Sequence, residues 1–135
     1  MDGNQHGVQL SLGSAGNLVR GNVMRNTEEF AIYMFQSGST PEVEGNTGRP
    51  NRNVVFNNVV FGAGEGVKTV DADLNVITFN TFAGVNVLRF KTSLLNLFAL
   101  NHVTGGVDTA VESGSCMDQA SSFGRRCDDG QAVEV

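Results

Sequence analysis

The sequence predicts an all-β protein folded as a parallel β-helix, a solenoid in which short strands stack from one coil to the next. The first observation is a short apolar run between two asparagines five positions apart. It occurs four times, at residues 17–22, 53–58, 75–80 and 96–101. The second observation is the step between copies, which is 22 and then 21 residues for the last two. Repeats at such a period are typical of solenoids.

The third observation is composition. The chain has 17 glycines, only two prolines and abundant Val, Phe and Asn, and its apolar residues show no helical periodicity. These features favour short strands and tight turns. We therefore expect four to five coils of about 22 residues. Asparagines at the same turn of successive coils, ~4.8 Å apart, would form ladders of side-chain hydrogen bonds. The alternative is an irregular sandwich whose turns use Asn.

The elements follow in chain order. Residues 1–6 are polar, the segments 13–16, 25–29 and 62–65 are expected turns, and the segment 36–50 contains both prolines and is an expected surface loop that lengthens the first step between copies. The expected strands are 7–12, 17–23, 31–35, 53–61, 66–70, 75–82, 86–90, 96–103 and 106–111. The predicted domain is thus residues 1–111 with the insert 36–50, followed by a cap or tail at 112–135. Cys116 and Cys127 in that tail form either one disulfide or two free thiols.

Charge and motifs exclude several classes. The 135 residues carry a net charge of −5, of which residues 112–135, with five acids and two bases, supply −3. No basic stripe suggests nucleic acid, and no apolar stretch approaches the ~18 residues of a membrane span. The N-terminal residues show no secretory signal. No P-loop, zinc spacing or serine-nucleophile motif is present.

Aligning the third and fourth coils on Asn75 and Asn96 assigns side chains to faces. Strand alternation then sends Val67, Leu88, Thr69 and Phe90 inward and sends Lys68 and Arg89 outward. The outward column is expected to contain Gln9, Tyr33, Lys68, Arg89 and Asp108, beside a second column of Ser11, Phe35, Val70 and Lys91. Two cations with an amide and the only tyrosine would suit a polymer that bears carboxylates. The alternative is an ordinary solvated sheet face, with Asp71 and Asp73 compensating the cations.

Other candidate sites are weaker. His6 and His102 are the only histidines, and several coils separate them, so a joint metal or catalytic site is not expected. His6 immediately precedes a strand, whereas His102 is an expected turn residue. Asp71 and Asp73 could hold calcium, although calcium needs six or more oxygen ligands. No metal or other cofactor is therefore assigned.

Three segments carry a family resemblance: a strand that begins His6-Gly7, the Asn-bounded strand at 17–22 and the strand 30–35 followed by Gln36-Ser37. Together they resemble the right-handed β-helix of the mannuronan C5-epimerases, the alginate-epimerising enzymes of bacteria and brown algae. The resemblance covers about residues 5–103. It places His6 where the family has a groove histidine and Lys68 where it has a basic strand residue, while Gln36 stands where an acid is common.

The resemblance implies an extracellular or cell-wall isomerase that converts mannuronate to guluronate residues in alginate. Its C5 proton is removed and another is returned from the opposite face, while the sugar carboxylate is neutralised. On this basis His6 and Tyr33 are the candidate proton-transfer residues, and Gln9, Lys68 and Arg89 are the candidate substrate-binding residues. The expected partner is an anionic, alginate-like polysaccharide, and no nucleic acid or membrane is expected.

One departure from the family concerns catalysis. The family's Asp-Pro-His-Asp motif lies upstream of the matching region, and this chain has no such motif. We therefore expect a monomer or a part of a longer chain, a C-terminal portion of an epimerase that binds polymer without a complete catalytic set. The alternatives are a related polysaccharide lyase fragment and a non-catalytic carbohydrate-binding or structural module.

Overall fold

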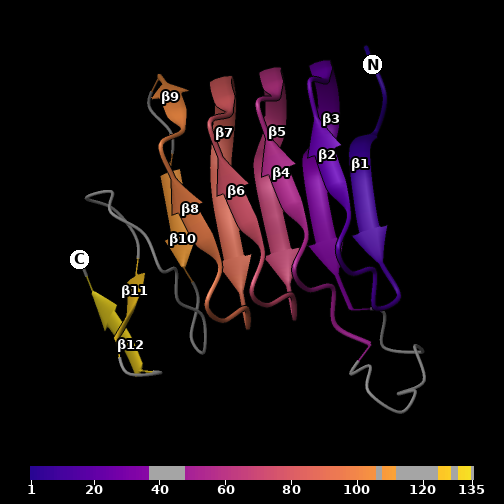
Figure 1. Ribbon diagram of the computed structural model, residues 1–135. Coiled ribbons are helices and arrows are strands. Elements are labelled where there is room, and N and C mark those ends of the chain that lie inside the picture. The colour runs from indigo at the N-terminus through magenta and orange to yellow at the C-terminus, as the bar shows by residue number, and fades with distance from the viewer. Residues whose placement is uncertain (37–47, 106–107, 112–124, 129–130, 135) are drawn as a thin grey trace.

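The computed structural model describes residues 1–36, 48–105, 108–111, 125–128 and 131–134, with side chains for the first two ranges (Figure 1). Within these residues the protein is all-β, as predicted, with no helix. The strands are β1 (His6–Ser11), β2 (Leu18–Arg20), β3 (Val23–Phe35), β4 (Val54–Phe56), β5 (Val59–Val70), β6 (Val76–Thr78), β7 (Thr81–Lys91), β8 (Leu97–Ala99), β9 (His102–Thr104), β10 (Asp108–Val111), β11 (Arg125–Asp128) and β12 (Gln131–Glu134).

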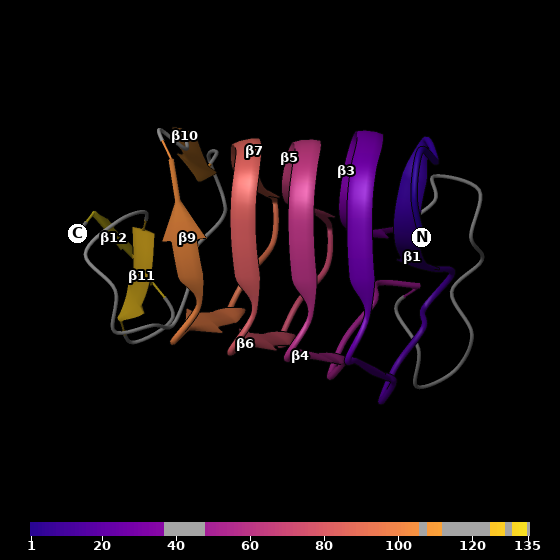
Figure 2. The same ribbon diagram turned by 90° about the horizontal axis from the view of Figure 1, so that it is seen from above.

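Two parallel sheets form the body of the molecule. The larger sheet has the order β1-β3-β5-β7-β10, with β9 also paired to β7, and the smaller sheet has the order β2-β4-β6-β8. From β1 to β9 the chain therefore alternates between the sheets, and each strand from β3 to β9 pairs with the strand two elements earlier, while β10 also pairs with β7. Figure 1 shows this steady progression from the N-terminal side, and Figure 2 shows the long strands side by side with short strands in a second layer.

The long strands bend at residues in the left-handed region. Asn26 in β3 has φ 52°, and Gly62 in β5 and Gly84 in β7 have φ 66° and 63°. The register places these three residues beside one another, because Thr27 pairs with Ala63 and Ala63 pairs with Val85. A row of left-handed residues turns all three strands at the same height without ending their pairing.

This bend corrects two sequence predictions. The segments 25–29 and 62–65, predicted as turns, lie inside β3 and β5. Their Asn and Gly residues do supply left-handed backbone, which favours those residue types. The strands nevertheless continue, with a shift in register between Thr27 and Phe30 and another between Glu65 and Val67. Conversely, the strands predicted at 17–23, 53–61, 75–82 and 96–103 each break into two, because the chain turns a corner at the second asparagine.

The predicted asparagine ladders are confirmed, and they flank the smaller sheet on both sides. In one ladder the side-chain amide of Asn53 donates to Oδ1 of Asn75, and Asn75 donates to Asn96, both at 3.0 Å. In the other, Asn58 donates to Asn80 at 2.9 Å. Each of these asparagines is buried and also donates to a carbonyl of the preceding repeat, so the turn groups are satisfied.

The core lies between the two sheets and takes its side chains from alternate strand positions. The inward placement predicted from alternation is confirmed, since Val67, Leu88, Thr69 and Phe90 are all fully buried. Phe98 from β8 joins the layers. Its ring centre lies 6.0 Å from that of Phe82 and 5.7 Å from that of Phe90.

Of the predicted insert 36–50, residue 36 and residues 48–50 are described, and residues 37–47 lie outside the described range. Gly48 and Pro50 are buried, so this end of the predicted surface loop is packed. Arg49 between them forms ion pairs with Asp71 at 3.2 Å and Asp73 at 2.7 Å. It also donates to the carbonyl of Thr92 at 2.7 Å. The insert is thereby joined to the two repeats that follow it.

The C-terminal region contains an antiparallel pair, β11 with β12, instead of a further parallel strand. The boundary predicted after residue 111 stays a prediction, because residues 112–124 lie outside the described range. The prediction about a disulfide falls outside the described residues, because Cys116 and the side chain of Cys127 are not among them.

Candidate functional site

The outer face of the larger sheet carries the column of side chains predicted from alternation. Strand pairing places Gln9 beside Tyr33, Tyr33 beside Lys68 and Lys68 beside Arg89. The second predicted column is also in register: Ser11, Phe35, Val70 and Lys91. The fifth member was wrong, because Ala110, and not Asp108, pairs with Arg89.

Aromatic rings form a continuous row along β3 on this face. The ring centres of Phe30 and Tyr33 are 4.6 Å apart, and those of Tyr33 and Phe35 are 4.3 Å apart with the last two rings stacked. His6 extends the row from β1, since its ring stacks on Phe30 at 5.2 Å with an angle of 10° between the planes. The row presents a partly exposed apolar surface next to the cationic column.

Lys68 lies directly over this row. Its ammonium nitrogen is 4.3 Å from the centre of the Phe30 ring and 5.6 Å from that of Tyr33. Both distances are within the range of cation–π attraction. The aromatic rings therefore hold the ammonium group at the surface of the sheet, where a bound anion would meet both a cation and a ring.

Arg89 is paired within the face. Its Nε donates to both carboxylate oxygens of Glu65, at 3.1 and 3.2 Å. Asp71 and Asp73, which compensate the cations in the alternative of an ordinary solvated face, instead pair with Arg49. The reason is the register: Glu65 lies earlier on the same strand as Lys68, whereas the two aspartates follow the end of β5 and face the returning insert.

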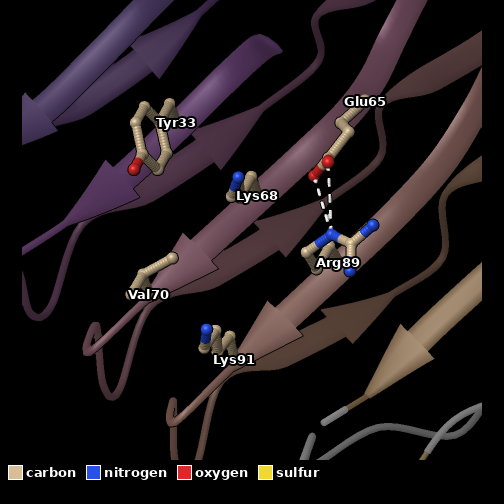
Figure 3. A pocket seen from close by; sticks show the side chains of 6 residues that line it. All are labelled: Tyr33, Glu65, Lys68, Val70, Arg89 and Lys91. Atoms are coloured by element: carbon tan, nitrogen blue, oxygen red, sulfur yellow. Dashed lines mark hydrogen bonds and ion pairs between the residues drawn. The ribbon is translucent and has the colours of Figure 1, made fainter. Parts of the chain in front are cut away.

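The space between these side chains is an open groove of about 440 Å³. Figure 3 shows its lining, which comes from three adjacent strands. The lining residues are Tyr33, Glu65, Lys68, Val70, Arg89 and Lys91. Three of the six are basic and one is acidic, so the groove favours an anionic ligand.

His6 lies on β1 next to the aromatic row, with its ring centre 6.3 Å from that of the groove residue Tyr33, within a small network of polar side chains. Its Nε2 is 3.0 Å from Oε2 of Glu29, and its Nδ1 is 2.6 Å from Nε2 of Gln9. Gln5 donates to the other oxygen of Glu29 at 2.7 Å. The hydrogen bonds from His6 and Gln5 lower the pKa of the Glu29 carboxyl below its usual value. Glu29 is therefore ionised at neutral pH and acts as an acceptor.

Tyr33 keeps its proton. Burial of the ring, together with the negative charges of Glu65 and Glu29, raises the pKa of the phenol above 10.0. This environment suits a neutral phenol that donates a hydrogen bond, and it disfavours a phenolate base. Of the two predicted proton-transfer residues, Tyr33 is thus the less suited to act as a base.

The two aspartates considered for calcium, Asp71 and Asp73, are bound by groups of the protein itself. The guanidinium of Arg49 contacts Asp71 and Asp73, and the backbone N–H of Leu94 donates to Asp73 at 2.8 Å. Within the described ranges, no group of three or more His, Cys, Asp or Glu side chains could hold a metal ion. His102, predicted as a turn residue, begins β9 and pairs with Thr81, far along the sheet from His6.

The structure thus brings all five predicted site residues to one face. Sequence reasoning missed Glu29, Glu65 and Phe30, because the first two were assigned to turns and the third to a turn boundary. The register between the strands that carry Tyr33 and Lys68 could have revealed two of them. Counting back from the predicted pair of Lys68 and Tyr33 would have placed Glu65 and Phe30 together.

Among the described residues, no helix is long and apolar enough to cross a membrane. No protein-family model, curated protein or solved structure matches the chain. The site must therefore be interpreted from its own geometry.

Proposed function

We propose that the chain binds an anionic, alginate-like polysaccharide along the groove, and that it acts outside the cell, where such polymers occur. The observation that carries this proposal is the position of Lys68, whose ammonium lies over Phe30 and Tyr33 at the edge of an open groove. A uronate offers both matching groups, a carboxylate for the cation and an apolar ring face for the aromatic rings.

The supporting scaffold is proposed to be a right-handed parallel β-helix. Parallel pairing at steps of 21 and 22 residues supports this, as do the two asparagine ladders. Parallel crossover connections are right-handed in the great majority of proteins. Such a scaffold spaces equivalent side chains ~4.8 Å apart, so a polymer lying across the strands would meet one residue of the column after another.

A binding measurement tests the proposal directly. The chain has one tyrosine and no tryptophan, so its intrinsic fluorescence reports on Tyr33 alone. Titration with polymannuronate should change this emission saturably, and a neutral mannan should not. Lys68→Ala should weaken the affinity roughly tenfold, equivalent to about 1.4 kcal/mol.

The matched control is Arg20→Ala, which removes a cation from β2 in the other sheet. Its affinity should equal that of the native chain, while added salt should weaken native binding. The proposal fails if Lys68→Ala binds as tightly as the native chain, or if Arg20→Ala loses as much affinity as Lys68→Ala.

A second candidate function is mannuronan C5-epimerisation, favoured by the contact between the His6–Glu29 pair and the aromatic row. In this reaction His6 would take the C5 proton, the electron pair would pass to the sugar carboxylate beside Lys68, and a donor such as Tyr33 would return a proton to C5. The redox state of the sugar does not change. Because His6 and Tyr33 lie on one face of the sheet, this reaction requires the sugar ring to lie between them.

Proton NMR of polymannuronate incubated with the chain distinguishes the reactions. New guluronate signals would support the epimerase, and unsaturated chain ends would support a lyase, which expels the 4-O substituent after the same proton abstraction. An unchanged polymer with retained binding would identify a non-catalytic binding module.

A further inference from the structure

The contacts of His6 determine which of its nitrogens carries a proton. An ionised carboxylate can only accept hydrogen bonds, so the 3.0 Å contact to Glu29 requires a proton on Nε2 of His6. Glu29 is ionised because its hydrogen bonds lower its pKa. In the neutral imidazole, Nδ1 is then the unprotonated and basic nitrogen.

The basic nitrogen is directed toward the groove column. Nδ1 of His6 is 2.6 Å from the amide nitrogen of Gln9, which donates to it. Gln9 is the register neighbour of Tyr33, and Tyr33 in turn pairs with Lys68. Stacking on Phe30 at 5.2 Å fixes the plane of the His6 ring. Nδ1 of His6 is the atom that would face a sugar bound over Tyr33. In the unbound protein it accepts a hydrogen bond from the amide of Gln9.

We propose that Glu29 is a positioning residue: it holds His6 as the Nε2–H tautomer and so leaves Nδ1 as the basic atom of the polysaccharide site. This inference rests on the proposed function for its substrate and adds a role for a residue that the sequence had assigned to a turn. A bound uronate displaces the Gln9 amide from Nδ1. Nδ1 then takes the C5 proton, Nε2 keeps its own proton, and Glu29 stabilises the resulting imidazolium.

The surroundings of Glu29 fit a positioning role better than a structural one. Its side chain is 46% exposed, so it does not fill the core. Gln5 holds its second oxygen at 2.7 Å, which orients the carboxylate toward His6. The positive charge of Lys68 on the next strand also favours the ionised form. Carboxylates fix histidine tautomers in this manner in metal and catalytic sites.

The test is ¹⁵N NMR of the imidazole nitrogens, which distinguishes protonated from unprotonated nitrogen directly. The chain has two histidines, so a His102→Gln variant leaves only the signals of His6. At a pH where His6 is neutral, we expect an unprotonated Nδ1 and a protonated Nε2. Glu29→Met should shift both nitrogens toward intermediate values, because both tautomers become populated.

Two variants make the result specific. Glu29→Gln keeps an oxygen acceptor and should retain the Nε2–H tautomer. Glu28→Gln removes the neighbouring charge, which makes no side-chain hydrogen bond to His6 among the described contacts, and should leave both nitrogen shifts unchanged. A native protein with the proton on Nδ1, or a Glu29→Met variant with unchanged shifts, would overturn the inference.

Addition of polymannuronate separates this inference from the proposed function. Displacement of Gln9 predicts a shift of Nδ1 but not of Nε2 on binding, and Gln9→Ala should abolish most of that shift. If Tyr33 fluorescence shows no binding, the proposed function fails while the tautomer result stands. If binding occurs and Glu29→Met leaves the tautomer unchanged, only the role of Glu29 is overturned.

Discussion

The side-chain amide of Asn58 donates a 2.9 Å hydrogen bond to Oδ1 of Asn80, and both residues are 1% exposed. Asn58 also donates to the carbonyl of Val19 at 3.0 Å. Replacing Asn58 with alanine leaves these buried partners unsatisfied, which costs about 1–3 kcal/mol. Urea denaturation should show this loss, while the folded fraction should keep any affinity for polymer, because the ladder lies away from the groove.

The adjacent residue provides the control. Asn57 has φ 53° and is exposed, and its side chain makes no hydrogen bond among the described contacts. Glycine adopts this backbone conformation readily, so Asn57→Gly should change the stability by less than about 0.5 kcal/mol. Equal losses at positions 57 and 58 would contradict a specific role for the ladder.

Thr69 offers the opposite case. Its hydroxyl is fully buried in the core and has no hydrogen-bond partner among the described residues. Valine has a similar shape without the hydroxyl, so Thr69→Val should raise the free energy of unfolding by about 1 kcal/mol. Thr78 is the control, because its hydroxyl donates to the carbonyl of Ala99 at 2.8 Å. Thermal unfolding should show a gain for Thr69→Val and no gain for Thr78→Val.

The phenol of Tyr33 should titrate above pH 10.0, because burial, Glu65 and Glu29 all raise its pKa. The folded chain then keeps this proton at a pH where the unfolded chain loses it. The corresponding contribution to stability is complete below pH 10 and is lost as the pH rises through the folded pKa. The ultraviolet absorbance of phenolate measures this titration for Tyr33 alone, since no other tyrosine is present.

Changing one neighbour tests the cause of that shift. Glu65→Gln should lower the titration midpoint of Tyr33, because it removes a negative charge that disfavours the phenolate. Glu28→Gln makes the same change in charge outside the groove and should leave the midpoint in place. An unchanged midpoint in Glu65→Gln would show that the charge of Glu65 does not contribute to the raised pKa of Tyr33.

Arg49 should be important for stability although it lies in the insert. Its guanidinium contacts both Asp71 and Asp73 and is only 25% exposed. Arg49→Met removes these charge-assisted hydrogen bonds and should lower the free energy of unfolding by about 1.5–3 kcal/mol. Arg52→Met, at an exposed turn position three residues later, should have an effect below about 0.5 kcal/mol. Chemical denaturation of both variants at neutral pH compares them directly.

The sequence predicted the ladders and the outward column because both depend on local regularities. The spacing of five between asparagines and the alternation within a strand do not depend on the length or conformation of the loops. The bends at Asn26 and Gly62 could not be distinguished from turns, since the same residue types serve both. The register of β10 against β7 could not be predicted from alternation either. Alternation alone permitted Asp108 as the neighbour of Arg89, whereas the step of 21 residues leads from Arg89 to Ala110.

The contacts of the candidate site depended on side chains that approach from elsewhere in the fold. Arg89 pairs with Glu65, whereas Asp71 and Asp73 both pair with Arg49. Arg49 lies in the insert, which does not follow the repeat. The sequence alone does not tell which acidic residue pairs with which basic residue. Only the position at which the insert returns to the sheet decides which pairs form.

Every link in both asparagine ladders points the same way, since each side-chain N–H donates to the oxygen of the next asparagine along the chain. Their amide dipoles therefore add along the stacking direction, as peptide dipoles add along a helix. The positive end lies toward Asn96 and Asn101, and the negative end lies toward Asn17 and Asn22. The two ends of the stack are thus electrically unequal, so anions favour one and cations the other.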